Sequence, residues 1–265
     1  MSLIAFSQVW KEYGGHVVLE RLNLTVKPGE FCTIVGASGC GKTTFLRLLL
    51  GEEQPTRGHI RLDGRDLPGE PGPDRGVVFQ RYSVFPHLTV LKNVMLGLEL
   101  KGARLTGHLF GAAWRAARER ARDMLESVGL GQSLGKYPAE LSGGMQQRLA
   151  LAQSLIMQPR ILLLDEPFGA LDPGIRADMH ELVLSLWQKS GLTVFMITHD
   201  LKEGFYLGTR LLVFDKVRID AQALHAYGAT ITYDLSLART PAGTIEDIRR
   251  HVEEEVPRAL EAAVT

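Results

Sequence analysis

The stretch from Gly36 to Thr44, with the sequence GASGCGKTT, is the feature that most constrains this chain. It matches the phosphate-loop pattern G-x-x-x-x-G-K-[ST] in full. The apolar run from Phe31 to Val35 precedes it and is typical of a buried strand, and the residues from Thr44 to Leu50 favour a helix. A strand, a glycine-rich loop and a helix in this order are the context that polyphosphate binding requires. The sequence therefore predicts a nucleotide-binding α/β core.

Each residue type in this loop has a physical role. Glycines let successive backbone N–H groups turn toward a polyphosphate, and the helix N-terminus adds its partial positive charge. Lys42 supplies a full positive charge, and Thr43 is left to hold a magnesium ion. We expect the loop to contact the nucleotide through Gly36, Ala37, Ser38, Gly39, Cys40, Gly41, Lys42, Thr43 and Thr44.

The composition narrows the classes of partner. The 265 residues include 30 Lys plus Arg and 30 Asp plus Glu, so the net formal charge is zero and no basic field argues for nucleic acid. The two cysteines, Cys32 and Cys40, fit packing roles in a reducing compartment. No run reaches the roughly 18 apolar residues of a membrane span, and the N-terminus lacks a signal-peptide pattern. We expect a soluble, cytosolic protein that meets a membrane only through a partner.

Four apolar runs read as parallel strands that are covered on both faces. They are Phe31 to Val35, Val77 to Phe79, Ile161 to Leu164 and Val194 to Ile197. The segments that follow them are, in the same order, the phosphate loop, Gln80, Asp165-Glu166 and Thr198-His199. Open α/β sheets bind ligands outside the carboxyl ends of their strands. The four polar ends are therefore expected to converge on one site.

Other segments indicate subdomains around this core. Short alternating runs in the first sixty residues suggest an antiparallel sheet. A helix is expected over Ala112 to Val128 with Gly129 as its stop, and another from near Ser142 to a point before Pro159. Near the C-terminus, the pattern predicts a strand at Thr230 to Tyr233, followed by a helix that runs towards Ala263.

Two further motifs identify a family. Leu141 to Arg148 reads LSGGMQQR, and Ile161 to Pro167 reads ILLLDEP. They closely resemble the signature and Walker B motifs of ATP-binding-cassette (ABC) ATPases, whose six motifs all occur here in order across residues 36 to 199. The resemblance implies an α/β, P-loop NTPase (RecA-like) core with an N-terminal antiparallel β subdomain. It implies a nucleotide-binding domain over residues 1–220, with a helical subdomain inserted at about 88–157, and a C-terminal extension over 221–265.

The resemblance also assigns roles to residues outside the phosphate loop. Glu166 would polarise the water that attacks ATP, with His199 at the γ-phosphate and Gln80 sensing the magnesium ion and the water. Mg²⁺ would be held by Thr43, Gln80 and Asp165, and Tyr13 would stack on adenine. The remaining nucleotide contacts would come from Ser142, Gly143, Gly144, Gln146 and Asp172. Purely structural readings exist for several of them: Ser142 and Asp172 as helix N-caps, His199 as an ordinary polar residue, and Tyr13 as a solvent-facing strand aromatic.

An assembly follows from the signature. Its glycines make a second anion site at a helix N-terminus, and in the family two cassettes enclose two ATP molecules between one copy's phosphate loop and the other copy's signature. The chain resembles the separate ATPase subunit of a bacterial uptake transporter, most of all the nitrate, sulfonate and taurine group, with some likeness to urea- or guanidine-carboxylation systems. The implied partners are a second copy of itself, membrane permease subunits and, indirectly, an extracytoplasmic solute-binding protein. The chain would then lie at the inner face of the membrane.

The segment Arg81 to Thr89 resembles the surface on which a permease helix docks, although Phe85 within it could instead pack on the chain's own helical subdomain. The segment 107–114 is longer than usual for this subdomain. Three alternatives stay open: an export or lipoprotein-release ATPase, a soluble ABC ATPase of DNA repair or translation, and another P-loop enzyme. The sequence lacks the long heptads or second cassette of the soluble machines, and the N-K-x-D motif of a GTPase.

Overall fold

The computed structural model describes residues 3–79, 84–102, 109–218 and 226–237. They form two compact units. The first unit combines residues 1–49, 53–67 and 195–265, and the second combines 50–52 and 68–194. The domain boundaries expected from the sequence stay predictions.

The first unit contains the antiparallel sheet that the N-terminal alternation predicts. Its strands are β1 (Ile4–Tyr13), β2 (His16–Val26), β4 (Arg57–Leu62) and β5 (Arg65–Asp66), in the order β2-β1-β4-β5. The second half of β2 alternates between exposed and buried side chains, with Leu22, Leu24 and Val26 buried. The period of two therefore places one face of this sheet in the core.

A second set of strands in this unit positions the phosphate loop. Strand β3 (Phe31–Gly36) pairs in parallel with β9 (Arg210–Asp215), and β10 (Thr230–Ser236) pairs antiparallel with β9. Strand β8 (Thr193–Ile197), whose last three residues belong to this unit, lies on the other side of β3. The expected strand at Thr230 to Tyr233 lies within β10, whereas the expected helix after it falls outside the described residues.

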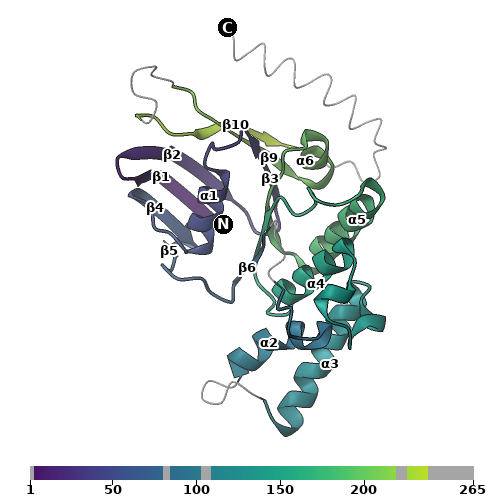
Figure 1. The fold of residues 1–265 in the computed structure, drawn as a ribbon. Helices are drawn as coiled ribbons and strands as arrows, with labels where there is room; N and C mark the ends of the chain where they lie inside the picture. The colour runs from purple at the N-terminus through teal and green to yellow at the C-terminus, as the bar shows by residue number, and fades with distance from the viewer. Residues whose placement is uncertain (1–2, 80–83, 103–108, 219–225, 238–265) are drawn as a thin grey trace. The chain divides into compact units, whose positions relative to one another are not determined.

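One aromatic side chain joins these layers. Helix α1 (Lys42–Leu50) begins directly after the phosphate loop and lies beside the β1-β2-β4 sheet (Figure 1). The Phe45 ring on α1 is fully buried and lies 4.9 Å from the Phe6 ring of β1. It also contacts Phe214 of β9 at 5.2 Å and Phe195 of β8 at 6.1 Å. Packing around Phe45 therefore fixes the helix that carries the loop's lysine.

The second unit holds the remaining expected strands and the helical subdomain. Strand β6 (Arg75–Val78) pairs in parallel with β7 (Ile161–Asp165). Helices α2 (Val90–Gly102), α3 (Gly111–Ser127) and α4 (Gly143–Leu155) follow in this unit, with α5 (Pro173–Ser190) after β7. Two short 3₁₀ turns, Gly131–Ser133 and Pro138–Glu140, connect α3 to α4.

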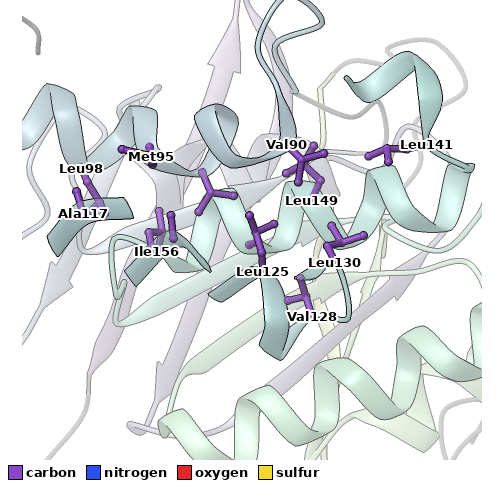
Figure 2. Packing of buried hydrophobic residues seen from close by; sticks show 13 residues of the cluster. Val90, Met95, Leu98, Ala117, Leu125, Val128, Leu130, Leu141, Leu149 and Ile156 are labelled. Atoms are coloured by element: carbon purple, nitrogen blue, oxygen red, sulfur yellow. The ribbon is translucent and has the colours of Figure 1, made fainter. Parts of the chain in front are cut away.

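An apolar cluster of its own stabilises the helical subdomain. Figure 2 shows side chains of α2, α3 and α4 that point toward one another. Leu125, Leu149 and Val94 are fully buried there, one from each helix. Burial of a Leu or Val side chain contributes about 1.5 to 3 kcal/mol, so a cluster of thirteen buried apolar residues from these helices and the segments next to them can hold the subdomain together.

The helix boundaries follow the local signals in the sequence. Gly129 adopts a positive φ of 76°, directly after the Val128 cap of α3. Ser142 caps α4, because its Oγ accepts a hydrogen bond from the Met145 N–H at 3.4 Å. Among the described residues, no helix combines the length and the apolar character needed to cross a membrane.

Candidate functional site

The phosphate loop joins β3 to α1, and two of its positions accept only glycine. Gly36 has φ 151°, and a Cβ there would lie 2.2 Å from the Phe214 carbonyl oxygen. Gly41 has φ 88°, and its Cβ would lie 2.7 Å from Leu19 Cδ2. A side chain at Gly36 would collide with the β9 backbone, and one at Gly41 would press on the Leu19 side chain in a left-handed backbone conformation that favours glycine. The glycines of the motif are therefore needed for packing as well as for backbone conformation.

Lys42 lies at the start of α1 with its charge turned back over the loop. Its ammonium donates hydrogen bonds to the Gly36 carbonyl at 2.7 Å and to the Ala37 carbonyl at 2.8 Å, and the residue is 6% exposed. Both of these acceptors are neutral, so the two bonds orient the cation without cancelling its charge. A cation, a helix N-terminus and a glycine loop together form a site for a polyphosphate anion.

Both cysteines are buried thiols, as the sequence predicts. Burial raises the pKa of the Cys32 thiol in β3 and of the Cys40 thiol in the loop. Cys40 Sγ lies 3.9 Å from Lys42 Nζ, whose positive charge opposes this rise without cancelling it. A protonated thiol fits a packing role for both residues.

Tyr13 is the last residue of β1, and its side chain contacts Glu53 and Lys11. Its ring is 43% exposed, and its hydroxyl donates a hydrogen bond to Glu53 Oε2. Lys11 Nζ lies 4.9 Å from the ring centroid. Burial, followed by the hydrogen bond to Glu53 and its negative charge, raises the pKa of the Tyr13 phenol to about 12. Tyr13 is therefore a neutral aromatic surface that is partly open to solvent.

His199 lies at the same sheet edge as the phosphate loop. It follows β8, and the Thr198 N–H donates to the Ile34 carbonyl of β3 at 3.1 Å, two residues before Gly36. Asp200 then caps α6 (Leu201–Leu207), since its Oδ1 accepts from the Lys202 and Glu203 N–H groups. The fold thus brings together two of the four strand ends expected to converge, and the imidazole is exposed there.

In the second unit, Asp165 and Glu166 follow one another at the end of β7. Both are half-buried. Glu166 has a φ of 49°, in the left-handed region that residues other than glycine rarely adopt. Such a conformation costs on the order of 1 to 3 kcal/mol and is typical of functional positions, where it re-aims a side chain. The unusual backbone at Glu166, directly after Asp165, therefore marks this strand end as a candidate functional position.

The signature segment also belongs to the second unit. Ser142 and Gly143 are exposed at the N-terminus of α4, where backbone N–H groups can meet an anion. Gly144 is buried, and a Cβ there would lie 2.5 Å from Ile175 Cγ2 of α5. Ile175 follows Asp172 by three residues, so the signature and the Asp172 segment are packed together.

Three other residues expected to contact the nucleotide or the metal are not shown in such a role by the structure. Gln146 Nε2 donates to the Pro138 carbonyl at 2.9 Å and to the Leu141 carbonyl at 3.3 Å, so this side chain braces the segment before α4. Asp172 occupies the N-cap position of α5, but its side chain makes no capping hydrogen bond and is exposed. Gln80 falls outside the described residues. The nucleotide roles of all three stay predictions.

Asn93 organises the loop that the sequence marks as a docking surface. It is fully buried on α2, and its Oδ1 accepts from the Phe85 N–H at 2.7 Å. Its Nδ2 donates to the carbonyls of Phe85, Leu88 and Thr89 at 2.9 to 3.1 Å. We call residues 84–89 the docking loop. The sequence interpretation missed Asn93, whose signal is a polar residue next to the buried Val94 and Met95.

A pocket of about 280 Å³ lies next to the docking loop. Its wall is mostly apolar and includes Val77, Phe79, Phe85, Ala150 and Met157. Phe85 is 39% exposed and lines this pocket together with Ala150 and Met157, so its side chain is partly covered by the chain itself and partly open, and both interpretations of it stay predictions. Ser154 Oγ also lines the pocket and has no hydrogen-bond partner within the part of the chain that the structure describes.

Comparison with known proteins agrees with these motifs. The sequence profile of the ABC transporter family matches residues 19–169. The chain is 45% identical over 200 residues to the nitrate import ATP-binding protein NrtD of Synechocystis, which covers 76% of this chain and 71% of that protein. An uncharacterized ABC transporter ATP-binding protein of Methanocaldococcus jannaschii is 46% identical over 204 residues (76% and 73%). The Fe(3+) ions import ATP-binding protein FbpC of Brucella abortus is 43% identical over 212 residues (79% and 58%).

Solved structures show the same architecture. The dimeric, post-hydrolysis structure of the ATP-binding cassette MJ0796 with ADP and Pi matches with a TM-score of 0.71 and 29% identity, over 89% of this chain and all of that one. The ADP conformation of the cassette MJ1267 matches with a TM-score of 0.76 over the whole chain and 99% of that one. Its identity of 21% supports the fold alone.

The geometry of Lys42 leads to a first prediction. Lys42→Ala removes the cation held over the loop, and a hydrogen bond to a charged group contributes about 1.5 to 3 kcal/mol, so ATP affinity falls by about 10- to 100-fold. Calorimetric titration of ATP into the purified chain measures the change. Lys27→Ala, at an exposed position away from the loop, is the matched control and binds as wild type. Equal affinities of Lys42→Ala and wild type would remove Lys42 from the nucleotide site.

Proposed function

The chain belongs to the ABC transporter family as an ATP-binding subunit with ATPase activity, and we propose that it powers the uptake of a small solute through a bacterial-type transporter. The observation that carries the proposal is the loop in which Lys42 is oriented by two neutral carbonyls above a glycine-lined helix N-terminus. Two relatives that share more than 40% of their aligned residues with the chain are import proteins.

The solute class follows from the relatives. NrtD is a nitrate import protein, and the motif segments resemble the nitrate, sulfonate and taurine group, so a small solute of this kind, or a urea-like compound, is the proposed cargo. FbpC imports Fe(3+) ions, which supports the direction of transport but not the solute. The export and soluble alternatives have no such support among these relatives.

The proposed chemistry assigns one task to each side chain. Lys42 and the loop N–H groups neutralise and orient the polyphosphate. Glu166, as the general base, accepts the proton of the attacking water, and its unusual backbone conformation sets the direction of its carboxylate. His199, at the edge of β8, would contact the γ-phosphate. Gln80 would orient the water.

Magnesium is proposed as the metal that accompanies ATP. The expected ligands, Thr43, Gln80 and Asp165, offer only oxygen atoms, which Mg²⁺ prefers, and Mg²⁺ commonly completes its shell with water and substrate phosphates. Among the described residues, no group of three or more His, Cys, Asp or Glu side chains is arranged to hold a metal ion. A site built from few protein ligands plus ATP phosphates fits this. Bound Mg²⁺ would offset phosphate charge during hydrolysis.

Two copies of the chain are proposed to share each ATP. Ser142 and Gly143 expose backbone N–H groups at a helix N-terminus, a feature suited to a phosphate that is bound by another copy's loop. Gly144 packs on Ile175, close to Asp172, so both segments can respond to the same nucleotide. The dimeric structure of MJ0796 with ADP and Pi supports this arrangement by similarity.

A permease is proposed to dock on the second unit, with a solute-binding protein beyond it. The supporting feature is the docking loop, fixed by Asn93 and adjacent to an apolar pocket with Phe85 at its rim. An exposed aromatic beside an apolar hollow is a typical anchor point of a protein interface. By analogy with the importers, the chain would lie on the inner side of the membrane through this contact.

The role of Glu166 can be tested by Glu166→Gln. The amide cannot accept the proton, so single-turnover hydrolysis falls by roughly 10² to 10⁴ while ATP binding is retained. Because ATP then persists, light scattering detects a dimer with ATP and Mg²⁺ and a monomer without them. The exposed Glu119→Gln on α3 serves as control and behaves as wild type. Hydrolysis within twofold of wild type would exclude Glu166 as the base.

The docking surface can be tested by Phe85→Asp. Burying an unpaired charge in an apolar interface costs on the order of several kcal/mol, so the variant fails to co-purify with its encoded permease while ATP binding persists. Phe110→Asp, at a position 73% exposed and outside the docking loop, is the matched control and co-purifies normally.

A thermal melt distinguishes the other outcomes for Phe85→Asp. A near-normal melt with loss of the complex supports the docking role. Collapse of the fold would place Phe85 in the chain's own core, and normal assembly with normal transport would place the permease contact elsewhere.

A further inference from the structure

One acidic residue, Glu53, connects Tyr13 to two cations. The Tyr13 hydroxyl donates to Glu53 Oε2, and Lys11 Nζ lies 3.0 Å from the same oxygen. Arg47, from the last turn of α1, approaches Glu53 Oε1 at 3.6 Å. The side chains of Glu53 and Lys11 are only 18% and 13% exposed, so this pair is shielded from solvent more than a surface ion pair is. No motif in the sequence includes Glu53 or Lys11.

The network determines which ring face of Tyr13 is free. Lys11 Nζ donates to the Gln54 carbonyl at 2.9 Å, which holds the ammonium in place over one face of the Tyr13 ring. A planar base can then stack only on the opposite face. A cation over one face also withdraws electron density from the ring, which favours stacking with an electron-rich base on the other.

The network also connects Tyr13 to the helix that carries the phosphate-binding lysine. Arg47 lies on α1, the helix that begins with Lys42, and its contact with Glu53 at 3.6 Å ties this helix to the carboxylate that holds the Tyr13 hydroxyl. The distance between the aromatic ring and the phosphate loop is therefore set by side-chain contacts and not by the backbone of β1 alone.

The protonation states favour these contacts. Burial acts to raise the pKa of Glu53, but hydrogen bonds from Tyr13 and Lys11 and the positive charges nearby outweigh it and hold the pKa below its usual value. The pKa of the Tyr13 phenol is raised to about 12, first by burial and then by Glu53. At neutral pH the carboxylate is ionised and the phenol keeps its proton, so the donor and the acceptor are matched.

We propose that Glu53 is a positioning residue that fixes the Tyr13 ring as the platform for the adenine base. The inference rests on the proposed function, in which Tyr13 stacks on adenine. Tyr13 is the last residue of β1 and is partly exposed, so its ring is not fixed by core packing, and the hydrogen bond to Glu53 limits the rotamers open to it. A ring held in one orientation before binding loses less conformational entropy when the base stacks on it.

The test compares a ligand that has the base with one that lacks it. Calorimetry measures the affinities of the full chain for ADP and for inorganic pyrophosphate. Tyr13→Ala weakens ADP binding by roughly 5- to 150-fold, the range for the loss of one stacked base. Glu53→Ala weakens it by roughly 3- to 10-fold because the platform is no longer held. Both variants bind pyrophosphate within about twofold of wild type, since the phosphate loop is unchanged.

Three further variants sharpen the result. In the double variant Tyr13→Ala with Glu53→Ala, ADP affinity equals that of Tyr13→Ala alone, because Glu53 acts only through Tyr13. Glu53→Gln keeps an acceptor for the phenol and recovers most of the lost affinity. The exposed neighbour Glu52→Ala is the matched control and binds both ligands as wild type. Thermal melts confirm that each variant is folded.

The outcomes separate this inference from the function it rests on. Unchanged ADP binding by Tyr13→Ala would show that Tyr13 is not the base platform, which removes the stacking role and this inference together. If Tyr13→Ala binds ADP weakly but Glu53→Ala binds it as wild type, Tyr13 keeps its stacking role and only the positioning role of Glu53 is overturned. Equal losses for ADP and pyrophosphate in Glu53→Ala would make Glu53 a general structural brace, which also contradicts the proposal.

Discussion

The close contact of the phosphate loop with two neighbouring strands is the constraint on which the rest of this structure depends. A Cβ on Gly36 would collide with the Phe214 carbonyl of β9, and a Cβ on Gly41 would collide with the Leu19 side chain of β2. The loop can therefore keep its shape only if both positions are glycine, which has no Cβ to collide with the neighbouring strands. In that shape, two loop carbonyls orient the ammonium of Lys42, and α1 starts with its N–H groups toward the same space. Charge and backbone are thus held in place by the chain's own contacts, and such preorganisation lowers the cost of binding.

The chemistry is divided between the two units of the chain. The first unit carries the phosphate loop and two further residues proposed to contact the nucleotide, Tyr13 with its acidic partner and His199. The second unit carries the acidic pair Asp165 and Glu166, the signature helix and the docking loop. In the second unit, the elements meant to act on nucleotide and on a partner are each held by specific contacts, Gly144 against Ile175 and Asn93 against the docking loop. The contacts that shape the phosphate loop therefore differ from those that hold the signature helix and the docking loop.

The sequence predicts well those features that depend on short-range residue patterns. The loop, the Ser142 cap, the Gly129 stop and the alternating strands depend on residues a few positions apart. Strand β9 was not predicted, because its apolar run from Leu211 to Phe214 is followed by no recognised motif, and only the fold shows that it pairs with β3, some 180 residues earlier. Glu53 lies 40 residues from Tyr13, and only the fold brings them together. Gln146 matches a motif, yet its side chain braces the preceding turn, because local carbonyls were within its reach.

We propose that each ATP lies between the phosphate loop of one copy and the signature of another, and complementation between two variants tests this arrangement most directly. Lys42→Ala disables the loop, and Ser142→Arg blocks the signature with a bulky cation, so each variant alone is inactive. In a mixed dimer, one site combines the intact Lys42 of one copy with the intact Ser142 of the other. The account predicts that mixing the two inactive proteins restores ATP hydrolysis well above the sum of the separate preparations. No gain on mixing, with dimers present by light scattering, would contradict the shared site.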